Sequence, residues 1–439
     1  MGRVFRRRLS GWEYPEAVRG EGVYLFDSEG RRYLDGSGGA IVVTVGHGVR
    51  EIADAISEQA ARLPYVHGTE FTSRAVETLA TELGKRAPVD DAHLYLVSGG
   101  SEATETAIKL ARRFHLARDE PARHKFIYRW PSYHGATLGA LALSGRSNMR
   151  AGFAPLLTPM PHIPAPYAYR CRLRGCGPTC SLECCRALEA KIREEGPETV
   201  AAFIAEPVVG ASVGAVVPPP DYYRLAREIC DRYGVLMIAD EVMCGMGRTG
   251  RWFAIEHWGV RPDIVTLGKG LTSGYVPGGG LLVKGEIVET LRAGGGFVHG
   301  FTYSHHPVVA ATGLAVVHYL ERHRLVERAA ALGAYLHERL QTLRDLPAVG
   351  DVRGLGLMAA VEIVQDRETR RPYPHERHAA EAIQREAFSR GLVVYPSGGQ
   401  ADGAGDLVMI GPPLVIERPQ IDELVSILRE AIVAATRSL

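Results

Sequence analysis

Short apolar runs alternate with longer amphipathic segments through the middle of the chain, from about residue 75 to residue 320. Such runs are typical of strands buried on both faces, and the segments between them show the spacing of amphipathic helices. Residues 101–116, for example, place Ala103, Ala107 and Leu110 on one helical face. The alternation predicts a mostly parallel sheet with helices on both sides. The predicted strands are residues 94–97, 125–128, 200–205, 235–239 and 264–267.

The two ends of the chain follow a different pattern. Residues 20–35 predict a hairpin with Ser28-Glu29-Gly30 at its turn. After about residue 325, two long helices are expected on either side of the segment VRGLGLMAAVEIV, followed by a short strand, a glycine-rich loop and a final helix. We therefore expect an α/β protein in which residues 71–325 form a large domain. Residues 1–70 and 326–439 together would form a smaller α+β domain.

Composition narrows the class of protein. The 439 residues are 46% hydrophobic and 23% charged, which excludes a disordered or fibrous protein. Lys and Arg number 51 against 50 Asp and Glu, so charge gives no argument for a nucleic acid or an anionic membrane as partner. No apolar run reaches the roughly 20 residues of a membrane span, and no apolar stretch follows the basic start. We expect a cytoplasmic protein.

Polar residues follow the predicted strands at their C-terminal ends, where open parallel sheets bind ligands. Ser98-Gly99-Gly100-Ser101 follows the first strand and opens a helix. Glycines let a phosphate approach the backbone, and the free amides at the start of a helix can hold it, although glycine turns also serve as plain connections. Glu206 follows the strand at 200–205.

Asp240 and Lys269 follow the next two predicted strands. Asp240 comes after the apolar run VLMIA, where an unpaired carboxylate is costly. It can be a helix N-cap, the partner of a buried arginine, or the partner of a cationic ligand. Lys269 lies between two glycines at the end of a buried strand. Burial lowers the pKa of such an amine and suits it to Schiff-base formation with an aldehyde.

A phosphate site, a buried carboxylate and a reactive lysine together point to pyridoxal 5′-phosphate. In this interpretation Lys269 binds the aldehyde, Asp240 keeps the pyridine nitrogen protonated, and the ring accepts electrons from the substrate. An aromatic side chain should stack on the ring. Tyr133, in the segment after the strand at 125–128, supplies one.

Several longer stretches carry a resemblance to a known family. The chain resembles the class III (subgroup II) pyridoxal-phosphate-dependent aminotransferases of fold type I, which include ornithine, 4-aminobutyrate and ω-amine aminotransferases. The resemblance implies a large domain with a central, mostly parallel seven-stranded sheet and a small α+β domain from both termini. The matching stretches are SGGSEATETAIKLAR, SYHG, AEPVVG, IADEVMCGMGRTG, DIVTLGKGL and GFTYSHHP.

The resemblance implies a role for each matching residue. Lys269 resembles the Schiff-base lysine, which also moves a proton between the substrate carbon and the cofactor. Asp240 resembles the partner of the pyridine nitrogen. Tyr133 and Val242 resemble the residues on the two faces of the ring. Glu241 and Arg248 lie in matching stretches, and we interpret them as structural supports. For Arg353 we expect a turn-stabilising hydrogen bond rather than a substrate contact.

The phosphate is assigned to residues of two subunits. Gly100 and Ser101 match the phosphate-binding pair, and Thr302 resembles a threonine that reaches the phosphate from the neighbouring subunit. The resemblance thus implies a homodimer, or a dimer of such dimers. The family needs no metal, and the adjacent His305 and His306 cannot both face one site on a strand, so no metal site is expected.

The chain departs from the family at the substrate carboxylate. Glutamate-using members place an arginine shortly before the final Pro-Pro-Leu, and it pairs at rest with the glutamate that corresponds to Glu206. In this chain that position is Met409. The loop YPSGGQADGAGD, where amine:pyruvate members carry a mobile arginine, has instead the two aspartates Asp402 and Asp406. We expect an amine or ω-amino compound as donor and a small keto acid, pyruvate rather than 2-oxoglutarate, as acceptor.

Rival functions and one sequence feature stay open. An aminomutase or epimerase of the same family would use the same cofactor residues, and a silent cofactor-binding protein would be expected to have lost one of them. Five cysteines fall between residues 171 and 185: Cys171, Cys176, Cys180, Cys184 and Cys185. They are either incidental thiols of a surface insertion or a metal or disulfide site, and their spacing is unlike a zinc finger.

Overall fold

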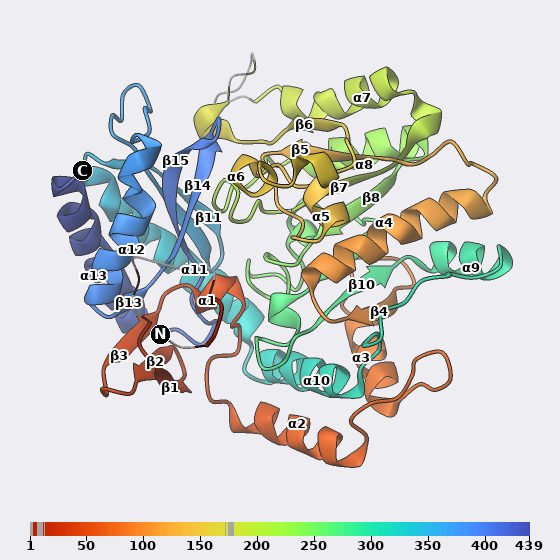
Figure 1. Ribbon diagram of the computed structural model, residues 1–439, viewed down its shortest axis with the longest axis horizontal. Helices are drawn as coiled ribbons and strands as arrows, with labels where there is room; N and C mark the ends of the chain where they lie inside the picture. Colours follow the sequence, from red (N-terminus) through yellow and green to blue (C-terminus); the bar gives the residue numbers. More distant parts are fainter. Residues whose placement is uncertain (1–2, 7–11, 13, 172, 174–179) are drawn as a thin grey trace.

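A seven-stranded sheet forms the centre of the computed structural model, which describes residues 3–6, 12, 14–171, 173 and 180–439 (Figure 1). Strand β10 runs antiparallel to both of its neighbours, and the other adjacent pairs are parallel. The predicted mostly parallel sheet is confirmed. In spatial order its strands are β4 (His93–Val97), β10 (Gly279–Val283), β9 (Ile264–Leu267), β8 (Leu236–Asp240), β7 (Val200–Ala205), β5 (Lys125–Trp130) and β6 (His162–Pro164).

Each of the five strands predicted for this sheet is present, within two residues at either end. The other two strands of this sheet, β6 and β10, are not among those that the sequence predicts. Strand β10 begins with Gly279-Gly280, which weakens its sequence pattern, and β6 is a three-residue edge strand that ends in a proline. Both owe their extended conformation to pairing with a neighbouring strand rather than to a local signal.

Helices cover the sheet on both faces (Figure 1). Helix α4 packs against β9 and β10 with the apolar face that the sequence predicts, and α8 packs against β8 on the other side. The α-helices are α1 (Gly38–Ile41), α2 (Arg50–Arg62), α3 (Arg74–Gly84), α4 (Gly100–Ala117), α5 (Leu138–Ala142), α6 (Ser147–Arg150), α7 (Glu183–Glu195), α8 (Tyr222–Tyr233), α9 (Gly285–Ala293), α10 (Pro307–Arg322), α11 (Leu325–Gln341), α12 (Ala379–Ser389) and α13 (Arg418–Arg437).

Two four-stranded sheets are built from the ends of the chain. The hairpin β2–β3, predicted from residues 20–35, continues into β13 from the C-terminal part, because β3 and β13 pair in parallel. Figure 1 shows these strands beside α12 and α13. The domain boundaries at residues 70 and 325 stay predictions. In spatial order, the first sheet consists of β1 (Ala17–Glu21), β2 (Tyr24–Asp27), β3 (Arg32–Asp35) and β13 (Leu392–Val393). The second consists of β11 (Val349–Leu355), β12 (Met358–Ile363), β15 (Ala404–Ile410) and β14 (Tyr395–Ala401).

The glycine-rich segment 395–406 is not the loop that the sequence pattern suggested. It forms most of the hairpin β14–β15, in which Ala401 pairs with Ala404 across the two-residue turn Asp402-Gly403. Both turn residues have positive φ, 54° and 92°, as a type I′ turn requires. The dipeptide Asp-Gly is itself a strong hairpin signal. The turn could therefore have been predicted, although the many glycines around it suggested a loop.

No helix in the described ranges is long and apolar enough to cross a bilayer.

Candidate active site

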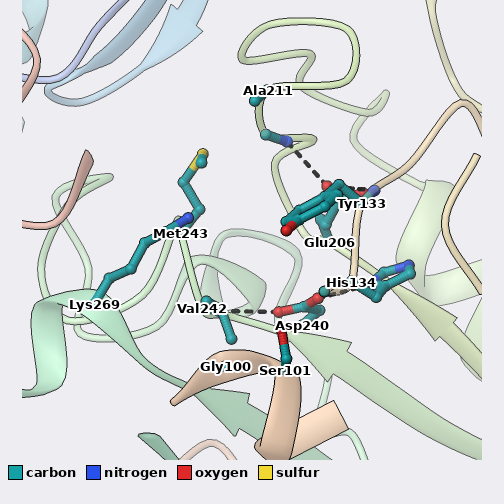
Figure 2. Close-up of a pocket in the computed structure, with 12 residues that line it drawn as sticks. Gly100, Ser101, Tyr133, His134, Glu206, Ala211, Asp240, Val242, Met243 and Lys269 are labelled. Atoms are coloured by element: carbon teal, nitrogen blue, oxygen red, sulfur yellow. Dashed lines mark hydrogen bonds and ion pairs between the residues drawn. The ribbon is translucent and has the colours of Figure 1, made fainter. Parts of the chain in front are cut away.

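The C-terminal ends of five strands of the large sheet surround one cavity of about 170 Å³ (Figure 2). The site residues predicted within one chain meet here, and Thr302 does not: it is exposed, and its carbonyl accepts a hydrogen bond from Tyr65. The lining residues are Gly100, Ser101, Tyr133, His134, Gly135, Glu206, Gly210, Ala211, Asp240, Val242, Met243 and Lys269.

The start of α4 forms a cradle that only small residues allow. A Cβ added at Gly100 would lie 2.8 Å from a methyl group of Val242, and one at Gly135 would lie 2.7 Å from the Ser101 hydroxyl. The Ser101 Oγ accepts a hydrogen bond from the backbone N–H of Ala136 at 3.0 Å. The first amides of this 18-residue helix have no partner within the helix and favour an anion. The cradle therefore fits a phosphate group.

Asp240, the last residue of β8, is held by three hydrogen bonds. One carboxylate oxygen lies 2.6 Å from Nδ1 of His134, and the other accepts from the N–H of Val242 at 3.1 Å and from the Thr266 hydroxyl at 3.0 Å. No arginine in the described ranges forms an ion pair with it. Its side chain is only 4% exposed, at the cavity wall, so a protonated ring nitrogen in the cavity is a fitting partner.

His134 is a polar residue of this site to which sequence reasoning gave no role. It is almost fully buried, and its Nε2 has no hydrogen-bond partner in the described part of the chain. Through Nδ1 it fixes the direction in which the Asp240 carboxylate faces. The available signal was its place next to Tyr133 in SYHG, at the same sheet edge as Asp240.

Lys269 follows β9 in an uncommon backbone conformation. Its φ is 41°, in the left-handed region that lysine seldom adopts, and its side chain extends into the cavity (Figure 2). Burial lowers the pKa of the Lys269 amine to about 8, although the carboxylates of Asp240 and Glu206 act in the opposite direction. This agrees with the lowered pKa that the sequence predicts. Roughly a tenth of the amine is then neutral, and nucleophilic, at pH 7, far more than of an ordinary lysine.

Glu206 lies on the opposite wall from the phosphate cradle. One of its oxygens accepts the N–H groups of Tyr133 at 3.4 Å and of Gly210 at 3.2 Å. The other, Oε2, is buried and has no hydrogen-bond partner among the described residues; the nearest guanidinium nitrogen, on Arg129, is 3.9 Å away. Burial raises the pKa of this carboxyl group. The wall thus presents a poorly compensated acidic group.

Three further residues of the matching motifs have structural partners, as predicted. Glu241 accepts two backbone N–H groups and the thiol of Cys244. Arg248 is buried and donates to three backbone carbonyls. Arg353 donates to two carbonyls of the segment before residue 215 and pairs with Glu362. None of the three lines the cavity.

The cysteine cluster lies away from this cavity. Cys184 and Cys185 are buried on α7, Cys171 and Cys180 are partly exposed, and Cys176 lies outside the described residues. Where the structure describes the chain, no cysteine forms a disulfide. Within the same ranges, no three His, Cys, Asp or Glu side chains are placed to hold a metal ion.

Known proteins are similar to this chain in both sequence and architecture. The sequence profile of the family "Aminotransferase class-III" matches residues 13–432. The chain is a class III aminotransferase. An uncharacterized aminotransferase of Bacillus subtilis, YodT, is 40% identical over 97% of this chain and 96% of its own. The putrescine–pyruvate aminotransferase of Pseudomonas aeruginosa is 39% identical over 94% of this chain and 90% of its own.

Solved structures agree with this assignment. A thermostable (S)-enantioselective ω-transaminase from Thermomicrobium roseum is 41% identical and superimposes with a TM-score of 0.88, over 97% of this aminotransferase and 92% of its own chain. The fold is that of the fold type I enzymes, as predicted, and the cofactor of the family is pyridoxal 5′-phosphate. The glycine cradle, the buried Asp240 and the lysine of lowered pKa fit that cofactor.

Proposed function

We propose that this aminotransferase moves an amino group from an amine or ω-amino compound to a small keto acid, with pyruvate preferred over 2-oxoglutarate. The reaction would run as two half-reactions at one site. The donor leaves its amino group on the enzyme and departs as a carbonyl compound, and the keto acid then takes the amino group and departs as an amino acid.

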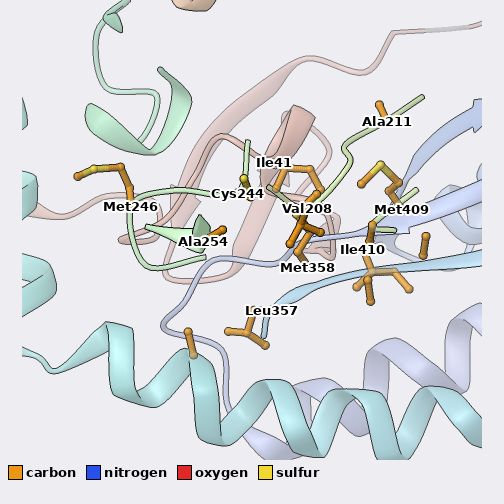
Figure 3. Close-up of a cluster of buried hydrophobic side chains, with 14 of the residues drawn as sticks. Ile41, Val208, Ala211, Cys244, Met246, Ala254, Leu357, Met358, Met409 and Ile410 are labelled. Atoms are coloured by element: carbon orange, nitrogen blue, oxygen red, sulfur yellow. The ribbon is translucent and has the colours of Figure 1, made fainter. Parts of the chain in front are cut away.

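The observation that carries the acceptor preference is the environment of Met409. The resemblance places the carboxylate-binding arginine of glutamate-using members at this position. In β15 the Met409 side chain is fully buried, and it lies in an apolar cluster with Ile410 and Met358 (Figure 3). The Oε2 of Glu206 has no hydrogen-bond partner among the described residues, which fits the loss of that arginine, its resting partner in glutamate-using members. The arginine of glutamate-using members binds the α-carboxylate of the substrate, and Met409 offers no cation for it.

The names of relatives leave the acceptor open at the level of the family. The relative from Pseudomonas aeruginosa is named for putrescine and pyruvate. A relative from Halomonas elongata, 36% identical, is named diaminobutyrate–2-oxoglutarate transaminase. The acceptor must therefore be argued from residues of this chain, and Met409 is the residue that favours pyruvate.

The residues of the cavity divide the chemistry between them. When bound here, pyridoxal 5′-phosphate supplies an aldehyde carbon that amines attack and a ring that accepts electron density from the substrate. We assign the phosphate to the cradle of Gly100 and Ser101. Asp240 would keep a proton on the ring nitrogen, and Tyr133 and Val242 would hold the two ring faces.

Lys269 and Thr302 complete the proposal. The neutral Nζ of Lys269 would take the proton from the substrate carbon that carries the amino group and return it during the second half-reaction. Thr302 would bind the phosphate of the neighbouring subunit, so the working enzyme would be a homodimer. Its exposure on the single chain leaves it accessible to such a partner.

Steady-state kinetics with two acceptors tests the proposal. With one amine donor in excess, we expect kcat/KM for pyruvate to exceed that for 2-oxoglutarate by about tenfold or more, since one charge-assisted carboxylate contact is worth roughly that factor. A reversed preference would contradict the proposed acceptor. Product formed without consumption of any keto acid would favour an aminomutase or epimerase.

A further inference from the structure

A second cavity, of about 460 Å³, lies beside the active site beneath the hairpin β14–β15. Its walls come from the segments after β5 and β6 and from the turn of the hairpin. Arg170 and Arg370 bring positive charge to it, and among the described lining residues Asp402 is the one acidic side chain. The charge of Arg170 is partly compensated by the buried Glu362, at 2.6 Å.

Gln400, in β14, lines this cavity and is only 4% exposed. Neither its amide nitrogen nor its amide oxygen has a hydrogen-bond partner among the described residues. Buried side-chain amides are nearly always bonded, and an unpartnered one is costly. An amide kept in this state inside a cavity points to a ligand that supplies the missing bonds.

Arg146 is not among the lining residues of either cavity, but it lies close to residues that line both. Its neighbours Gly145 and Ser147 line the second cavity, whereas its guanidinium lies 5.9 Å from the centre of the Tyr133 ring, which lines the first. One guanidinium nitrogen donates to the Ser397 hydroxyl at 3.1 Å, and that hydroxyl donates to the carbonyl of Ala211, another residue of the active-site wall.

None of the described residues neutralises the guanidinium of Arg146. No carboxylate in the described ranges lies within ion-pair distance of it, and its Nε is buried without a hydrogen-bond partner. Bonds to a carboxylate are the strongest that a guanidinium makes, and its planar donors match a carboxylate in shape. The position of Arg146 and its unpartnered Nε therefore fit an acidic substrate group.

We propose that the second cavity and its border form a carboxylate-binding subsite of the active site, with Arg146 and Gln400 as the recognising residues. The inference rests on the proposed function, in which a keto acid accepts the amino group. Arg146 would then serve as the carboxylate-binding cation that position 409 lacks. The ligand class is a carboxylate on a small aliphatic chain.

The first test compares acceptors with and without a carboxylate. In Arg146→Gln, kcat/KM for pyruvate should fall by about 10- to 100-fold, the range of one lost charge-assisted hydrogen bond, whereas kcat/KM for propanal should change by less than about threefold. Arg146→Lys should recover part of the loss. Arg118→Gln is the matched control, because Arg118 also lies over an aromatic ring, Phe114, but away from both cavities.

Equal losses with pyruvate and propanal would assign Arg146 to the support of Tyr133 and overturn the proposal, as would an unchanged rate with pyruvate. Should 2-oxoglutarate prove the better acceptor, the proposed function fails, and the same comparison is made with 2-oxoglutarate in place of pyruvate.

A second test needs no reaction. Calorimetric titration of the cofactor-loaded enzyme with propionate should show saturable binding, with propan-1-ol as the uncharged control. Affinity should fall about tenfold or more in Arg146→Gln and several-fold in Gln400→Leu, and stay unchanged in Arg118→Gln. No saturable binding to the parent enzyme, or equal binding to the parent and Arg146→Gln, would overturn the proposal whatever the preferred acceptor.

Discussion

The two sides of the active site are built on opposite principles. On the cofactor side, Asp240 at the end of β8 has a partner on each carboxylate oxygen, through three hydrogen bonds. On the substrate side, the hairpin β14–β15 carries Gln400 with both amide atoms unpartnered and lies against Arg146, which has no acidic partner in the described ranges. The chain itself therefore fixes the carboxylate of Asp240, whereas we propose that a ligand supplies the partners of Gln400 and Arg146.

We expect the cofactor side to serve the chemistry that is common to all substrates, and the hairpin side to determine which substrate binds. A satisfied, rigid network holds one cofactor in one orientation, which is what proton transfer at a fixed carbon requires. Unpaired groups cost stability and persist where a ligand compensates for them. Substitutions on the cofactor side should therefore affect every substrate alike, and substitutions on the hairpin side should discriminate between substrates.

The largest effect is expected at Lys269. Replacing it with alanine removes the group proposed to move the proton, which costs on the order of 10⁴-fold in kcat with every donor and acceptor. Lys109→Ala, an exposed lysine on α4, serves as the control and should keep full activity. Single-turnover rates of both half-reactions give the measurement. A kcat of Lys269→Ala within tenfold of the parent value would contradict the role of Lys269 in proton transfer.

A pair of buried carboxylates compares the two sides directly. Asp240→Asn weakens the proposed partner of the ring nitrogen and should lower kcat/KM by about 10²- to 10³-fold for all substrates. Asp406→Asn, in β15, should leave kcat/KM within twofold, because among the described residues Asp406 accepts only the backbone N–H of Ala380, a bond that asparagine can keep. An equal loss of kcat/KM in the two variants would contradict the proposed difference between the two sides.

The lowered pKa of Lys269 gives a pH dependence of about tenfold per unit. Only the neutral amine attacks an aldehyde, so capture of pyridoxal 5′-phosphate by the cofactor-free enzyme should accelerate about tenfold per pH unit and level off above about pH 8. An ordinary lysine, with its pKa of 10.5, would still accelerate at pH 9 and 10. Stopped-flow absorbance from pH 6 to 10 distinguishes the two, and continued acceleration beyond pH 9 would falsify the account of a buried, neutral amine.

The sequence allowed more to be predicted on the cofactor side than on the substrate side. Asp240 and Lys269 come directly after apolar runs, so the end of each strand, and hence its polar residue, could be located from local pattern alone. Gly100 and Ser101 were found in the same way, from a glycine turn opening a helix. These residues meet because parallel strands bring their C-terminal ends to one edge.

The hairpin side resisted prediction because its structure depends on distant pairing. Its glycines concealed β14 and β15, although the dipeptide Asp402-Gly403 did signal the turn. Nothing near Gln400 in the sequence shows that its amide would be left without partners, and nothing near Arg146 shows that it would lie over Tyr133 and bond Ser397, 251 positions away. Such contacts exist only once the strands from both parts of the chain have packed.

The smallest expected effect is also the one that tests the meaning of the unpaired groups. In Gln400→Leu, a side chain of similar size removes two buried polar atoms that have no partner in the described ranges, so the free energy of unfolding should rise by about 1 to 2 kcal/mol. In Gln59→Leu the amide that bonds the carbonyl of Leu63 at the end of α2 is lost, and stability should instead fall slightly. Urea unfolding of the two variants beside the parent measures both shifts. Greater stability together with weaker propionate binding in Gln400→Leu would show that the hairpin trades stability for recognition, whereas a loss of stability would mean that the amide is already satisfied in the folded protein.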